Sequence, residues 1–271
     1  MLDLRAINQR DFARAKIFWT IANALRGIIF IAGAWAVFIA NPSVYLPLLL
    51  FGLVVVAELC QWHSDSWKGH ADSLLRKLDL CRSFGREMTR GDLREIASRL
   101  PASLRKSTET ARRPDEYFTT SAPQGTQAAV ENLVESAWYT MKQARYMVGL
   151  FWFLGVVIVG TGLAALIVSS NEVHSLATRN DVSKVVTSWL LLIFSLGIFR
   201  NGWAYYKLFR RSEESYNVAS RLTDTDVDDN KALAHWYEYQ IVRASAPLLP
   251  SWLWHLKQRA LNEAWRIASA G

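Results

Sequence analysis

Two histidines and an aspartate are the residues whose types come closest to a metal site. His63, Asp65 and His70 lie just after an apolar stretch. A metal centre needs its ligands to converge on one ion. On a helix, spacings of two and seven residues do not bring all three side chains onto one face. We therefore predict no metal site here. A membrane enzyme that acts on lipid or isoprenoid substrates through His63 and Asp65 is a further hypothesis.

The sequence lacks the motifs of the common enzyme classes. It has no phosphate-binding loop ending in GKS or GKT, no G-x-G-x-x-G, no H-E-x-x-H and no G-x-S-x-G. Its two cysteines, Cys60 and Cys81, are too few for a disulfide framework or a four-cysteine zinc site. We predict that the chain is not an enzyme and holds no cofactor.

The C-terminal tail is the strongest candidate for a binding surface, because aromatic and basic residues alternate there. Aromatic faces stack nucleobases and cations neutralise phosphates, so this composition suits a nucleotide or a short single strand. The predicted ligand-binding residues are Trp236, Tyr239, Arg243, Trp252, His255, Arg259 and Arg266. The same pattern also fits a packed helical lobe with its aromatic residues inside, and composition alone favours that reading.

Four apolar stretches must position these residues. They cover residues 17–40, 45–62, 147–169 and 185–199, in a chain of 271 residues that is 51% hydrophobic. The first stretch would rise about 36 Å as a helix, against a hydrocarbon core of about 30 Å. A signal peptide would be shorter and would precede a soluble protein, whereas three more apolar stretches follow here. The sequence predicts an all-α membrane protein with four transmembrane helices.

The distribution of lysine and arginine predicts the orientation, because cytoplasmic segments retain positive charge. Residues 1–16 carry four of these cations, residues 63–146 carry fourteen and the tail from residue 200 carries ten. The connection 41–44 carries none, and 171–184 carries two. Both termini and the central segment are therefore expected in the cytoplasm. The formal net charge of +7 suits anionic lipid headgroups, nucleic acid or nucleotides.

The helical periodicity divides the chain into four parts. We expect 1–62 to hold the N-terminal region and the first two spans, 63–146 a cytoplasmic helical stalk, 147–203 the last two spans, and 204–271 a helical C-terminal domain. The second span should continue to Gly85, and a long helix should run from Thr126 into the third span. In the last helix, the expected packing stripe consists of Leu253, Leu256, Ala260, Ala264 and Ile267.

Polar residues inside the predicted bilayer allow two interpretations. Arg26 lies nine residues into the first apolar stretch, where an unpaired charge costs at least about 2.5 kcal/mol. It can pair with Glu58 of the second span, because a long arginine stem reaches along the helix. Alternatively, Asn23, Arg26 and Glu58 line a water-filled path in an oligomer. The sequence leaves both readings open.

Two segments resemble the bacterial four-transmembrane effectors that accompany SMODS-type nucleotidyltransferases in antiphage defence. They are the stalk segment WKGHADSLLRKLD (Trp67 to Asp79) and the stretch from Tyr117-Phe-Thr-Thr-Ser121 to Asn132-Leu-Val-Glu-Ser-Ala-Trp138. The order of two spans, a stalk, two spans and a helical tail extends the resemblance over most of the chain. It carries no ligand residue over to this sequence.

The resemblance implies a pore-forming effector that depolarises the bacterial inner membrane when a nucleotide signal from a partner nucleotidyltransferase changes. In related Hailong-type pairs, the signal resembles a single-stranded DNA oligomer that holds a tetrameric channel shut. The first hypothesis is therefore a homo-oligomeric channel gated by a nucleotide or a short oligonucleotide. The alternative is a non-conducting membrane scaffold that binds anionic lipid or a partner protein.

Overall fold

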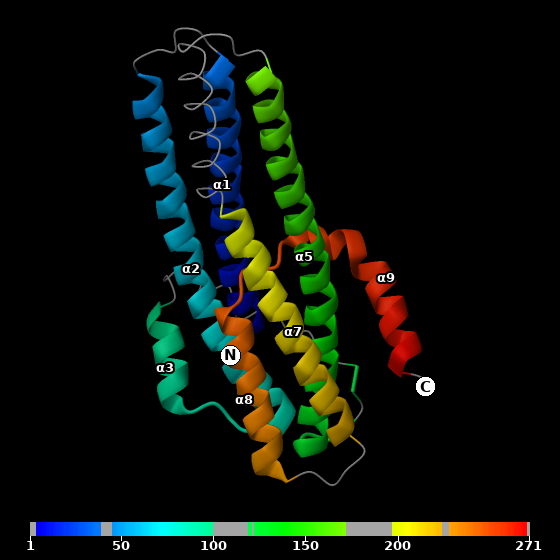
Figure 1. Cartoon of the computed structure of the whole chain (residues 1–271). Coiled ribbons are helices and arrows are strands. Elements are labelled where there is room, and N and C mark those ends of the chain that lie inside the picture. Colours follow the sequence, from blue (N-terminus) through cyan, green and yellow to red (C-terminus); the bar gives the residue numbers. More distant parts are fainter. Residues whose placement is uncertain are drawn as a thin grey trace. The chain divides into compact units, whose positions relative to one another are not determined.

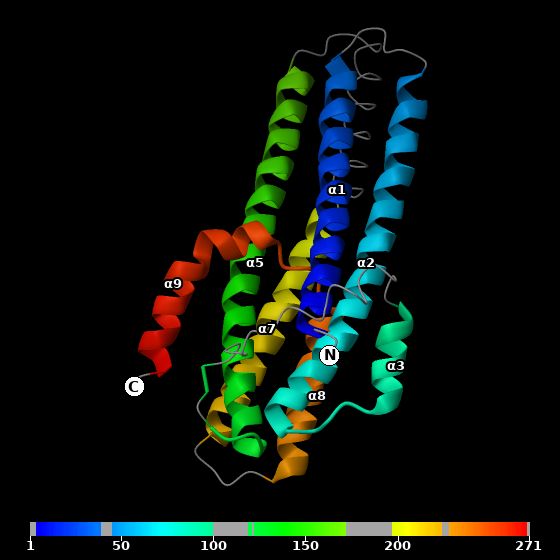
Figure 2. The same cartoon turned by 180° about the vertical axis from the view of Figure 1, so that it is seen from behind.

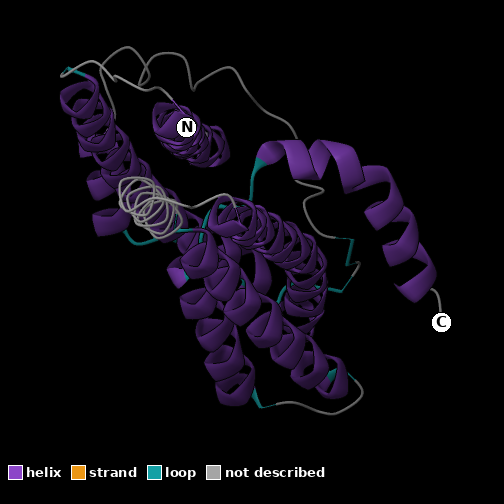
Figure 3. Ribbon diagram, turned by 45° about the horizontal axis from the view of Figure 1, so that its top comes forward, coloured by secondary structure: helices purple, strands orange, loops and turns teal. Residues whose placement is uncertain are grey.

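The computed structural model describes residues 4–38, 45–99, 119–120, 122–171, 197–223 and 228–269, and all regular elements among them are helices (Figure 3). The described helices are α1 (Leu4–Phe38), α2 (Leu46–Phe84), α3 (Arg90–Arg99), α5 (Thr126–Asn171), α7 (Ile198–Leu222), α8 (Asp229–Ser245) and α9 (Ser251–Ser269) (Figure 1). The predicted all-helical class is confirmed.

Three helices are long and apolar enough to cross a membrane. The candidate spans are Leu4–Gly33, Leu46–Phe84 and Thr126–Ala164. They contain most of the first three predicted apolar stretches, which fits a membrane protein. The fourth predicted span, residues 185–199, lies outside the described residues except for its end, and so do the predicted connection 41–44 and most of 171–184.

The ends of the long helices follow from local sequence. Gly85 directly follows α2 with a positive φ of 67°, a backbone conformation that glycine adopts without steric cost. At the other side of the central segment, α5 begins at Thr126 and continues without interruption into the apolar run from Met147. The predicted continuation of both spans beyond their apolar stretches is therefore confirmed.

Polar groups cap the N-terminus of the short helix α3 and attach it to α2. Asp92 and Thr89 exchange hydrogen bonds: the Asp92 amide donates to Thr89 Oγ1 (3.1 Å) and the Thr89 amide donates to Asp92 Oδ2 (3.2 Å). The Lys77 ammonium of α2 donates to Asp92 (2.6 Å) and to Glu95 (3.3 Å). These contacts explain why α3 lies beside α2 (Figure 2).

The chain forms two compact units. The first comprises Met1–Lys16, Asp65–Ala144 and Lys207–Gly271, and the second comprises Ile17–Ser64 and Arg145–Tyr206. We call them the polar unit and the apolar unit after the side chains that they expose. The polar unit combines most of the predicted stalk and tail with Met1–Lys16, which the sequence groups with the first two spans. Stalk and tail, which the sequence presents as separate parts, pack together in the polar unit.

The polar unit has an ordinary buried core. Leu133 and Ala137 of α5 pack with Ala219 of α7 and Tyr239 of α8. The buried Tyr239 hydroxyl donates to the Ser136 carbonyl oxygen (2.9 Å) and also contacts the hydroxyl of Thr140 (2.8 Å). The ring of Tyr239 packs in the core and its hydroxyl is hydrogen-bonded, so this residue stabilises the contact between α8 and α5.

The predicted packing stripe of α9 is wrong for four of its five positions. Leu253 is buried, but Leu256 and Ile267 are 69% and 68% exposed, and Ala260 and Ala264 are also exposed. The buried face is instead formed by Leu253 and Leu261, with the half-buried rings of Trp254 and Trp265. Aromatic rings bury more area than leucine or alanine, so the two tryptophans determine which side of α9 packs.

In contrast to the buried core of the polar unit, large hydrophobic side chains are exposed in the apolar unit. Its exposed side chains include large hydrophobic residues on all three long helices, among them Ile28, Ile31, Leu48, Phe51, Phe153 and Val156. Its buried residues include the charged Arg26. Gly155 lies so close to Phe199 that an added Cβ would be 3.2 Å from the ring, so a small residue is needed there for α5 and α7 to approach each other.

Candidate anion-binding cavity

A cavity of about 1090 Å³ lies within the polar unit. Its walls come from α1, α2, α5, α7, α8 and α9, from Thr119 and from the segment 246–250 between the last two helices. Pro247 and Pro250 stand in that segment, where their missing amide donors and fixed φ end α8 and separate it from α9. Residues far apart in the sequence therefore share one cavity.

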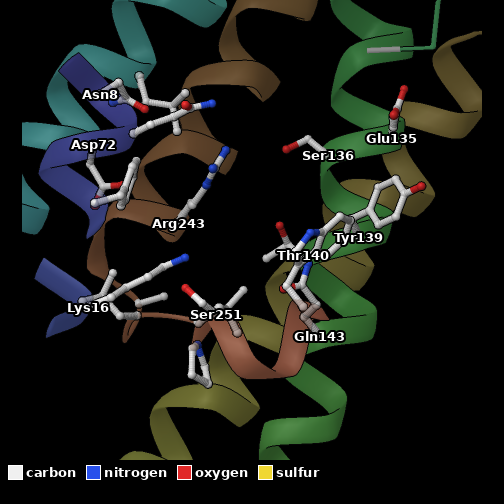
Figure 4. A pocket seen from close by; sticks show the side chains of 18 of the residues that line it. Asn8, Lys16, Asp72, Glu135, Ser136, Tyr139, Thr140, Gln143, Arg243 and Ser251 are labelled. Carbon is white, nitrogen blue, oxygen red and sulfur yellow. The ribbon is translucent and has the colours of Figure 1, made fainter. Parts of the chain in front are cut away.

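One wall is a polar face of α5. Glu135, Ser136, Tyr139, Thr140 and Gln143 recur at helical spacing and all line the cavity (Figure 4). Glu135 is oriented by Thr119, whose amide and hydroxyl both donate to Glu135 Oε2 (2.9 and 2.8 Å). The Tyr139 hydroxyl donates to Asn262 of α9 (3.0 Å). This wall offers hydroxyl, amide and carboxylate groups to a ligand.

The opposite wall is cationic. The Lys16 ammonium of α1 and the Arg243 guanidinium of α8 point into the space that faces α5 (Figure 4). Nearby, the buried Lys68 donates to Asp72 (2.6 Å) and to the carbonyl oxygen of Ala244. Lys68 and Asp72 thus compensate each other, and Lys16 and Arg243 add further positive charge to the lining of the cavity.

The lining residues have a clear surplus of positive charge. Six are cationic and two are acidic: Arg5, Lys16, Lys68, Arg82, Arg243 and Arg266 against Asp72 and Glu135. A concave surface with one dominant sign of charge concentrates ligands of the opposite sign. Arginine in addition presents a planar fork of donors that matches phosphate oxygens. The cavity is therefore suited to an anion.

Asp79 lies behind Arg243, and it is not one of the lining residues. Its Oδ2 atom accepts a hydrogen bond from Gln240 (3.2 Å) and lies 4.0 Å from Arg243 Nη1. Burial raises the pKa of the Asp79 carboxyl, because desolvation penalises its charged form. Gln240 and Arg243 are one helical turn apart, so Asp79 attaches this turn of α8 to α2.

Aromatic rings border the cavity beside its charged wall. Tyr139 of α5 lies between two tryptophans of α9, with ring centroids 5.9 Å from Trp254 and 6.0 Å from Trp265. All three residues line the cavity. Such rings provide apolar faces on which a nucleobase can stack, next to cations that can neutralise a phosphate.

The structure brings only some of the predicted ligand-binding residues together. Arg243 and Arg266 line the cavity. Trp236 and Tyr239 are buried in the polar unit, where Trp236 packs against Phe84. The other three, Trp252, His255 and Arg259, are exposed on α9 and do not line the cavity. The seven residues therefore do not form one surface.

Sequence reasoning missed the α5 wall and the cations of α1 and α2. The α5 wall had a readable signal, because Glu135, Ser136, Thr140 and Gln143 place polar groups on one side of an otherwise apolar helical pattern. Lys16 had none, since it stands at the edge of an apolar stretch, where a cation is expected for topology alone. Its position in the lining of the cavity follows only from the packing of α1.

The predicted pore residues lie in the apolar unit. Arg26 donates to Glu58 (2.8 Å) and to Gln61 (3.3 Å), so the predicted ion pair between the first two spans is present. Asn23 donates to the backbone oxygen of Trp19 one turn earlier (2.7 Å). Within the described residues, histidine, cysteine and acidic side chains do not gather into a group that could hold a metal ion, and His63 instead contacts the ring of Phe18.

Comparisons of the chain with family models, with curated proteins and with solved structures found no match.

Proposed function

We propose that the chain is the subunit of a homo-oligomeric ion channel whose conductance is controlled by a phosphorylated ligand bound in the cavity of the polar unit. The cationic surplus beside a set of aromatic rings carries this proposal. The ligand is a nucleotide or a short single-stranded oligonucleotide. Its phosphates lie against Lys16 and Arg243, and a base stacks near Tyr139.

The size and the polarity of the cavity support this class of ligand. Small-molecule sites typically measure about 300–1,000 Å³, and the cavity measures about 1090 Å³. It is therefore large enough for a nucleotide. The α5 wall adds groups such as Thr140 and Gln143, which can hydrogen-bond both base edges and phosphate oxygens.

Helix continuity supports coupling between ligand and membrane. Helix α5 carries the cavity residues 135–143 and the apolar run that begins at Met147, and α2 joins cavity residues to its own apolar stretch in the same way. A ligand that binds two arrangements of these helices with different affinity shifts the balance between them. Gating requires such a difference in affinity. It does not require the ligand to contact the pore.

The wider biological setting rests on the resemblance to four-transmembrane defence effectors. We place the protein in the bacterial inner membrane with four spans and both termini cytoplasmic. A partner nucleotidyltransferase makes the ligand, and opening of the channel depolarises the membrane during phage infection. The basic residues flanking the apolar stretches support this orientation.

Two arginines of α9 give a matched test of the binding site. Arg266 lines the cavity and Arg259 does not, and both are exposed. We expect Arg266→Gln to weaken binding of a short single-stranded DNA about tenfold or more. The plot of log affinity against log salt concentration has a negative slope, and its magnitude should decrease by about 0.7 for each lost phosphate contact. Arg259→Gln should change neither quantity.

Binding to the purified protein can be measured by fluorescence anisotropy over a range of salt concentrations, with Lys16→Gln as a second cavity variant. A loss on Arg259→Gln with unchanged binding by Arg266→Gln would move the ligand to the outer face of α9. No binding of single-stranded DNA or cyclic nucleotides by the wild type would contradict the proposed ligand class.

One observation favours the alternative of a non-conducting scaffold. Arg26 pairs with Glu58 and Gln61 of the same chain, so its charge is compensated without a water-filled path. A scaffold would show no conductance in any ligand state, whereas the channel requires flux that the ligand switches.

A further inference from the structure

The outer face of α9 combines apolar and basic side chains that no described helix covers. Trp252, Leu256 and Ile267 are 50%, 69% and 68% exposed. They lie along one side of the helix together with the exposed Ala260. This side differs from the packed side, which is formed by Leu253, Trp254, Leu261 and Trp265.

Basic residues border this apolar face. His255, Arg259 and Arg266 lie along one edge, and Lys257 lies along the other. Helical spacing places Glu263 within this face, between Trp252 and Leu256 around the helix. It stands four residues after Arg259 and three before Arg266, which is the spacing at which opposite charges on a helix pair. The arrangement is that of an amphipathic helix that lies in a membrane surface.

The attachment of α9 keeps its outer face available. Its inner side packs on Trp138, Tyr139 and Met141 of α5. In Figures 1 and 3, no other described helix lies beside α9 on the side that faces away from α5. Met147, where the apolar run of α5 begins, follows Met141 by six residues, about 9 Å along the helix.

We propose that the outer face of α9 lies in the headgroup layer of an anionic bilayer. Leu256 and Ile267 enter the acyl boundary, Trp252 occupies the interface that tryptophan favours, and Arg259 and Lys257 contact lipid phosphates. Charge complementarity selects anionic lipid over a second copy of the chain, because Lys257, Arg259 and Arg266 outnumber the one acid, Glu263, and a second copy would bring the same surplus of cations against this one. This inference does not depend on the proposed function, since it needs only a bilayer.

Depth-dependent fluorescence quenching tests the proposal on the full chain in vesicles. Cys60 and Cys81 are first replaced by serine, and a bimane label is attached to Leu256→Cys, to Ile267→Cys or to the control Asn217→Cys. Asn217 is exposed on α7 and belongs to the same unit. With phosphatidylglycerol in the vesicles, nitroxides on the lipid chains should quench the labels at 256 and 267 strongly and the label at 217 hardly at all.

Arg259→Gln together with Lys257→Gln should reduce the quenching at 256, and so should vesicles of phosphatidylcholine alone. Unchanged melting of the variant protein would show that the polar unit remains folded. Strong quenching of the label at 256 by a water-soluble quencher, equal to that at 217, would overturn the proposal. The proposal would also be overturned if the label at 256 were protected from both quenchers and the unlabelled Leu256→Cys formed disulfide crosslinks between two chains. This result would assign the face to a second copy.

Discussion

The polar and apolar units use the same kinds of side chain in opposite places. In the polar unit, Leu133 and Tyr239 are buried and charged groups such as Arg210 and Arg211 are exposed. In the apolar unit, Ile31 and Phe153 are exposed and Arg26 is buried. Since exposed apolar surface of this extent is unfavourable in water, the two units are built for different solvents.

Helix α5 contains both patterns within one continuous element. Its residues Leu133, Ala137 and Met141 are buried, whereas Trp152, Phe153 and Val156 are exposed further along. The helix is regular throughout, so the change lies in what surrounds it. Backbone hydrogen bonds within a helix are satisfied in either solvent, which allows one helix to pass from water to lipid.

The largest expected effect compares two leucines of α5. Leu133→Ala should lower the free energy of unfolding by about 2–5 kcal/mol, because it leaves a cavity in a packed core. Leu133 is 3% exposed, whereas Leu163 is 54% exposed. Leu163→Ala should change the stability in detergent by less than about 1 kcal/mol. Denaturant titration of the two variants measures the difference, and equal losses would contradict the division into two solvents.

The ion pair between the buried Arg26 and the exposed Glu58 gives the next largest effect. Glu58→Leu removes the partner 2.8 Å from Arg26 and leaves Gln61 as the remaining acceptor described there. Leaving a charge without compensation in a bilayer should cost about 2.5 kcal/mol or more. The double variant Arg26→Leu with Glu58→Leu should recover most of this loss. Thermal unfolding in nanodiscs measures it, and a double variant less stable than the single one would show that Arg26 has another partner.

A smaller effect concerns the hydroxyl that joins α8 to α5. Tyr239→Phe removes the contacts with the Ser136 carbonyl and the Thr140 hydroxyl and should cost about 1–2 kcal/mol. Its neighbour Tyr237 is exposed, so Tyr237→Phe should have little effect. The matched pair can be compared by denaturant titration. Similar stability of both variants would mean that water replaces the buried hydroxyl contacts.

The smallest effect is a pH dependence at α3. Hydrogen bonds from Lys77 and Thr89 lower the pKa of Asp92 from 3.8 to about 2. An acid whose pKa is lower in the folded state adds stability above its unfolded pKa, and this contribution disappears as the pH falls from about 4 through about 2. Nuclear magnetic resonance titration of the Asp92 carboxyl should show the low midpoint. Lys77→Gln should raise the midpoint, and an unchanged midpoint would exclude Lys77 as its main cause.

The helices were predictable because their signals are local. Gly85 ends α2, Thr126 begins α5, and the proline pair separates α8 from α9, each as the local sequence predicts. The cavity was not predictable, since it requires Lys16, Thr140 and Arg243 to meet through tertiary packing. The face of α9 was predicted wrongly because periodicity identified an apolar stripe without showing whether protein or another apolar phase covers it.

Ion flux from liposomes is the most direct test of the central claim, that a ligand in the cationic cavity controls a membrane channel. The purified wild type and Arg266→Gln are reconstituted at matched density, with correct insertion verified, and flux is recorded with and without short single-stranded DNA and cyclic nucleotides. We predict that one of these ligands switches the flux of the wild type, and that Arg266→Gln requires about tenfold more of it. The absence of flux in every ligand state would contradict the channel and favour the scaffold.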